Sequence, residues 1–68
     1  MKEYQRLADN LKSIEKQLEQ AENMLNYATD ELLIDSIIYE IESLYKRHAY
    51  YLRVLRELKT MAGEGYAV

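Results

Sequence analysis

Few residue types in this chain of 68 amino acids could carry chemistry, and their spacing favours structural roles. His48 is the single histidine, and there is no cysteine. A histidine that acts as a catalytic base needs an orienting carboxylate, but the nearest acidic residues in the sequence, Glu42 and Glu57, are not three or four positions away. We therefore predict that His48 has a structural or interface role and that the protein is not an enzyme.

Three carboxylates, Glu15, Glu19 and Glu22, are the other candidates for chemistry, as ligands of a metal ion. Their spacing places them on the solvated face of a helix. No Glu-x-x-His pair is present to direct ligands into the interior of a helical bundle, and no cysteine can supply a thiolate. The sequence predicts neither a metal site nor a cofactor.

Basic and aromatic residues alternate over residues 45–56, a composition typical of platforms that bind single-stranded nucleic acid. The candidate contacts are Lys46, Arg47, Tyr50, Arg53 and Arg56. However, the formal net charge of −3 gives no global attraction for nucleic acid or anionic lipid, and helical spacing assigns several apolar residues of this stretch to a packed side. Nucleic-acid association is therefore the alternative function.

Two apolar stripes along the chain predict an all-α fold. In both, apolar residues recur every three or four positions, the pattern of a packed helix face. The first stripe runs from Tyr4 to Ala28 and predicts a helix over about residues 2–28. The second runs from Ile34 to Ala62 and predicts a helix over about residues 30–62. The two stripes are out of phase by about 120°, so one continuous helix is disfavoured.

The two predicted helices fit an antiparallel hairpin. If Leu25 faces Ile34, then Leu18 faces Ile41, and every stripe residue meets another with paired numbers that sum to 58 or 59. Thr29 or Asp30 is the expected N-cap of the second helix. Residues 1–62 are thus predicted to form one hairpin domain, and residues 63–68 a flexible C-terminal tail.

The predicted second helix carries more apolar surface than the first helix can cover. Six residues beyond its stripe form the expected oligomer interface: Ile38, Tyr45 and Leu52 on one flank, and Leu33, Val54 and Met61 on the opposite flank. Leaving so broad a face in water is unusual for a soluble monomer. We therefore predict that two hairpins dimerise into a four-helix bundle, coiled-coil-like in its packing, with a different helical protein as the alternative partner.

Charge segregation predicts how the two copies are oriented. Residues 17–45 contain seven acidic residues and no basic one, whereas residues 46–59 contain five basic residues and one acidic residue. An antiparallel dimer places these unlike charges together. The leading function is accordingly a small structural or protein-interaction module that associates with itself through the second helix.

The expected location is the cytoplasm. No charged segment followed by an apolar one opens the chain, and no apolar run reaches the ~18 residues that a membrane-spanning helix needs. The sequence therefore predicts neither a signal peptide nor a membrane span.

One stretch resembles a known family. The segment Asp30-x-x-Leu33-Ile34-Asp35-x-x-Ile38-Tyr39, followed by Lys46-Arg47-His48-Ala49-Tyr50-Tyr51-Leu52-Arg53, is similar to the small YaaL-like proteins of spore-forming bacteria, a group of unknown function. This resemblance covers about half of the chain. It implies a small cytoplasmic helical protein of bacterial origin and supplies no activity, catalytic residue or cofactor.

Overall fold

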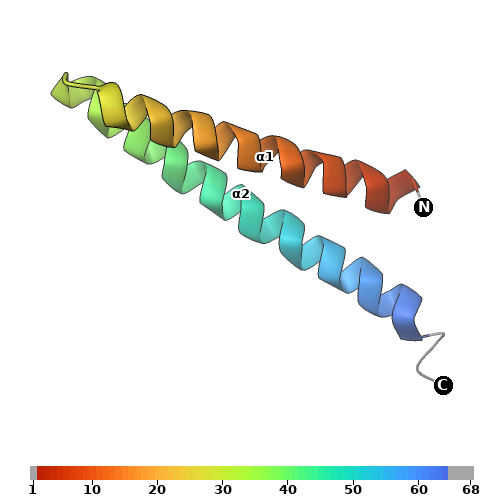
Figure 1. Ribbon diagram of the computed structural model, residues 1–68. Helices are drawn as coiled ribbons and strands as arrows, with labels where there is room; N and C mark the ends of the chain where they lie inside the picture. Colours follow the sequence, from red (N-terminus) through yellow and green to blue (C-terminus); the bar gives the residue numbers. More distant parts are fainter. Residues whose placement is uncertain (1, 65–68) are drawn as a thin grey trace.

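Two antiparallel helices make up the computed structural model, which describes the backbone of residues 2–64 and the side chains of residues 2–61. Helix α1 spans Lys2–Tyr27, and helix α2 spans Glu31–Glu64. They lie side by side, close together at their connection and diverging toward the termini (Figure 1). The predicted all-α hairpin is confirmed, and the described residues contain no strand.

A cap formed by Asp30 separates the two helices. Its Oδ1 accepts hydrogen bonds from the backbone N–H groups of Leu32 and Leu33, at 2.9 and 3.1 Å. These two groups belong to the first turn of α2 and have no partner within the helix, so the carboxylate satisfies them. The backbone N–H of Ala28 still bonds the carbonyl of Met24 at 3.0 Å, which closes the last turn of α1. Of the two residues predicted as the N-cap of the second helix, Asp30 is the one that caps it in the structure.

The far end of α2 lies two residues beyond its predicted end at 62, so Gly63 and Glu64 belong to the helix and not to the predicted tail. A glycine stops a helix when it adopts a left-handed conformation, and no described residue has a positive φ. The remainder of the predicted tail, residues 65–68, lies outside the described residues, as does the side chain of Ala62.

The core is a single seam between the helices. Its buried residues are Leu7, Ile14, Leu18 and Ala21 of α1 and Ile37, Leu44 and Leu55 of α2, each at most 9% exposed. At its centre Ile14, Leu18 and Leu44 form a cluster against which Ile41 and Tyr51 pack. This grouping agrees with the predicted register. No polar side chain among those described is buried.

The hairpin is long and thin, so a large share of its surface meets solvent. Its dimensions are 56 × 16 × 14 Å, and its radius of gyration is 16.2 Å, against about 11 Å for a compact domain of this length. The accessible surface is 5683 Å², against roughly 4,500 Å² for a folded monomer of this mass. Neither described helix has an apolar stretch long enough to cross a bilayer.

Candidate interaction surfaces

One side of the hairpin carries apolar residues of both helices that are partly or largely exposed. Ile38, Tyr45 and Leu52 are seven residues apart along α2 and therefore lie on one line beside the seam. Ile38 is 40% exposed and Tyr45 is 53% exposed. On the same side, Tyr4, Ala8 and Leu11 of α1 border a hollow of about 410 Å³ together with Leu52. We call these six residues the Tyr45 face.

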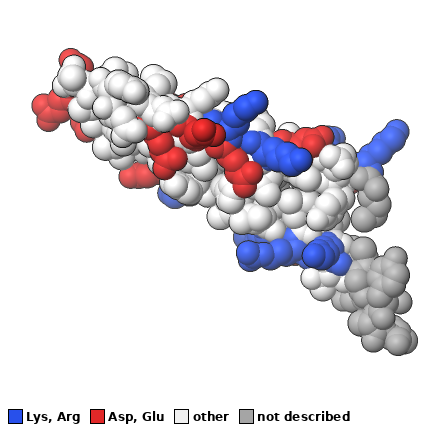
Figure 2. Space-filling view, in the orientation of Figure 1, with Lys and Arg blue, Asp and Glu red and all other residues white. Residues whose placement is uncertain are grey.

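Charges of opposite sign lie at the two ends of the hairpin. Lys12, Arg56 and Lys59 line the hollow of the Tyr45 face toward the open end. Asp30 and Glu31 lie at the connection between the helices. Figure 2 shows acidic side chains at the connection end, acidic and basic side chains across the middle, and mainly basic side chains toward the open end. The charge separation predicted along the sequence therefore becomes a separation along the length of the molecule.

A polar pair lies at the edge of the Tyr45 face. The Nε2 atom of His48 in α2 is 3.1 Å from Oε2 of Glu15 in α1. Because an ionised carboxylate only accepts hydrogen bonds, Nε2 is the donor. The histidine side chain is 24% exposed and the glutamate side chain 55%. His48 is thus partly buried at the border of the seam.

Sequence reasoning missed the carboxylate partner of His48, because it considered only acidic residues near the histidine in the chain and assigned Glu15 to solvent. The signal was present in the predicted register. His48 is paired with Leu11, and Glu15 lies one helical turn beyond Leu11 on the same side of α1. Within the described residues, no group of three His, Asp or Glu side chains is placed to hold a metal ion.

The opposite side of the hairpin is more polar. Leu33, Arg47, Val54 and Met61 share a line along α2, at spacings of seven or fourteen residues. Arg47 lines a hollow with Asn10, Ser13 and Gln17 of α1. We call these seven residues the Arg47 face. Three of the six predicted interface residues, Leu33, Val54 and Met61, therefore lie on this face, away from the other three.

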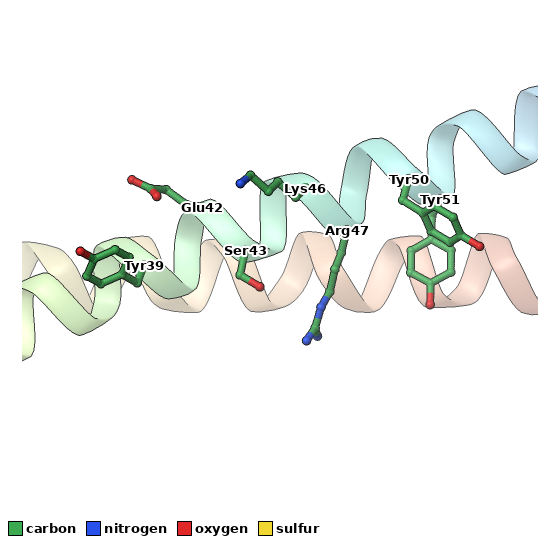
Figure 3. A pocket seen from close by; sticks show the side chains of 7 residues that line it. All are labelled: Tyr39, Glu42, Ser43, Lys46, Arg47, Tyr50 and Tyr51. Atoms are coloured by element: carbon green, nitrogen blue, oxygen red, sulfur yellow. The ribbon is translucent and has the colours of Figure 1, made fainter.

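A groove along α2 adjoins the Arg47 face and holds most of the predicted nucleic-acid contacts. It has a volume of about 640 Å³ and runs between Tyr39 at one end and Tyr50 and Tyr51 at the other, with Lys46 and Arg47 between them (Figure 3). Neither of these two basic residues forms an ion pair within the part of the chain that the structure describes. We call this groove the tyrosine groove.

The aromatic end of the tyrosine groove is ordered by stacking. The rings of Tyr50 and Tyr51 meet edge to face, with centroids 5.3 Å apart and planes at 70°. The guanidinium carbon of Arg53 lies 5.7 Å from the centre of the Tyr50 ring, within cation–π range. Arg56 lies apart, in the hollow of the Tyr45 face. The structure thus brings together four of the five predicted contacts.

Sequence reasoning placed the seam correctly and named both flanks of α2, and the structure distributes those flanks over two separate surfaces. The resemblance to YaaL-like proteins stays a prediction. Comparison with protein families, with curated proteins and with solved structures finds no match to this chain.

Proposed function

We propose that the protein is a non-enzymatic self-association module, in which two hairpins pack their Tyr45 faces together into a four-helix bundle. The observation that carries the proposal is the surplus of surface. The accessible area of 5683 Å² exceeds that of a compact monomer by about 1,200 Å², and a standard interface buries about 800 Å² from each partner. A second copy of the hairpin is large enough to cover that surplus.

An antiparallel arrangement satisfies both the apolar line and the charges. The line of Ile38, Tyr45 and Leu52 is symmetric about its middle residue, so a two-fold axis there places Tyr45 against its own copy and Ile38 against Leu52. In this register the numbers of paired α2 residues sum to 90, which brings Lys59 level with Glu31 of the second copy. A parallel pair would instead bring the acidic ends together.

The free energy of this association is moderate. A fully buried aliphatic side chain contributes about 1.5–3 kcal/mol, and both copies contribute the same set. Association costs an estimated 4–15 kcal/mol in lost freedom, so a few residues from each copy offset that cost with a narrow margin. The dimer should therefore dissociate on dilution.

Sedimentation equilibrium of the unmodified chain at micromolar concentrations tests the proposal. We expect a mass near twice 8.1 kDa that falls on dilution. The double substitution of Ile38→Glu and Leu52→Glu, which puts carboxylates into the interface, should abolish the dimer. Met61→Glu, on the Arg47 face, is the control and should leave the dimer intact. A well-folded monomer for the unmodified chain would contradict self-association and leave the Tyr45 face for a different helical protein.

A second candidate function is binding of single-stranded nucleic acid. It is favoured by Lys46 and Arg47, which lie between aromatic rings in the tyrosine groove and form no ion pair with another described residue. Fluorescence anisotropy with a labelled oligonucleotide over a salt series tests it. Binding should weaken steeply as salt rises, and Arg47→Ala should weaken it more than Arg56→Ala, which lies outside the groove. Absence of binding at low salt would dismiss this function.

A further inference from the structure

We infer that the His48–Glu15 pair makes self-association depend on pH, with the dimer favoured when the imidazole is protonated. This inference rests on the proposed function. The pair is the one side-chain hydrogen bond between α1 and α2 among the described residues. It joins positions 33 residues apart and belongs to neither the apolar seam nor the tyrosine groove.

The position of the pair exposes it to the partner. His48 lies three residues after Tyr45 and four before Leu52, so it is at the edge of the Tyr45 face and between these two residues along its length. Glu15 lines the hollow of this face together with Leu52. In the hairpin alone the glutamate side chain is 55% exposed. Covering the Tyr45 face with a second copy removes water from both groups.

The charge of the pair decides whether that burial is favourable. With neutral imidazole the hydrogen bond to Glu15 leaves one negative charge in the interface of each copy, and burying an uncompensated charge is strongly unfavourable. With protonated imidazole the pair carries no net charge, and its hydrogen bond is charge-assisted and stronger. Association therefore favours uptake of one proton by each His48.

Charged groups from both copies lie near the pair. Lys12 of α1 lines the same hollow as Glu15. Within one turn of His48 on α2 the residues on its side, including Tyr45 and Leu52, are uncharged. From the second copy, the proposed register brings Glu42 level with His48. Because lysine keeps its charge over the range in which histidine titrates, and carboxylates stay ionised there, the pH response is assigned to His48.

The sign of the response follows from these charges. Protons are bound more tightly in the dimer than in the monomer, so the dimer strengthens as pH falls through the range in which histidine becomes protonated. The dimer should thus be stronger at mildly acidic pH than above neutral pH.

Sedimentation equilibrium at about pH 6 and about pH 8.5, on either side of the range in which an ordinary histidine titrates, tests the inference. For the unmodified chain we expect a dissociation constant about tenfold lower at the acidic pH. The variant His48→Gln keeps a donor for Glu15 but cannot titrate, so it should show the same constant at both pH values. Glu15→Gln removes the carboxylate that pairs with the protonated imidazole, so its pH response should be smaller than that of the unmodified chain.

Each outcome separates the inference from the proposed function. A dimer of equal strength at both pH values, or an unchanged pH response in His48→Gln, overturns the inference and leaves self-association standing. A monomer at both pH values overturns both. A merely structural role of the hydrogen bond would make both variants weaker at both pH values and would leave their pH response unchanged.

Discussion

Glu15 of α1 and His48 of α2 lie 3.1 Å apart across the hairpin, one helical turn from the positions that the register of the seam pairs. The contact is possible only in that register, because a shift of one helix by a single residue rotates each side chain by about 100° relative to its partner. The pair therefore reports the alignment of α1 and α2.

The cap at the start of α2 can be tested with one substitution. Asp30→Ala removes the acceptor for the N–H groups of Leu32 and Leu33 and should lower the free energy of unfolding by about 1 kcal/mol. Urea denaturation followed by far-UV circular dichroism measures the change. Asp35→Ala is the matched control, because Asp35 also lies near the start of α2 and is not a cap; it should cost clearly less. Equal losses would contradict the capping role.

The packing of the seam gives the hairpin only a small free energy of unfolding. Leu44, at the centre of the core, is 3% exposed, and Leu44→Ala should cost about 2–5 kcal/mol through lost burial and the cavity left behind. A single core of this size supplies about 3–5 kcal/mol, so most of the helical signal should disappear at room temperature. Circular dichroism measures it. Leu32→Ala, at an 81% exposed position of the same helix, should stay folded.

Cross-linking tests the two-fold axis, because the chain has no cysteine of its own. Tyr45→Cys places the new thiol against its own copy, so mild oxidation should yield a disulfide-linked dimer on a non-reducing gel. Tyr50→Cys is the control: Tyr45 and Tyr50 are equally exposed, at 53% and 52%, but Tyr50 lies in the tyrosine groove. Cross-linking that is equally efficient at both positions would show that collision, and not the proposed interface, brings the thiols together.

A charge reversal tests the antiparallel orientation. Lys59→Glu places a carboxylate level with Glu31 of the second copy and should raise the dissociation constant by about fivefold, since exposed ion pairs contribute little. Adding Glu31→Lys restores opposite charges at both contacts and should recover the affinity. The difference should shrink at high salt, where such charges are screened. Sedimentation equilibrium of both single variants and the double variant completes a double-mutant cycle. If the effects of the two substitutions on the free energy of association are additive, this contact is contradicted.

The sequence was sufficient for the elements and their alignment because both depend on periodic burial. Leu18 packs in the cluster with Ile41 and Leu44, as expected from counting along two stripes. The choice of Asp30 over Thr29 as the cap required atomic geometry, since both residue types cap helices well. The predicted end of α2 was also too early, because Gly63 continues the helix when its φ is negative.

The candidate surfaces were less predictable because they depend on both helices together. Leu52 and Val54 are two residues apart and both apolar. Leu52 lines a hollow with Ala8 and Leu11, whereas Val54 lies on the same line of α2 as Arg47, which lines a hollow with Asn10. Only the rotation of α1 about its axis decides which flank meets apolar residues.

The position of the connection between α1 and α2 has a consequence for anything attached to this hairpin. Residues 2 and 64 both lie at the open end, so segments joined to either helix leave the molecule at the same end (Figure 1). In the proposed antiparallel dimer the two open ends point in opposite directions, separated by on the order of the 56 Å length of one hairpin. The assembly would then act as a rigid spacer that holds two attached bodies apart at a fixed distance.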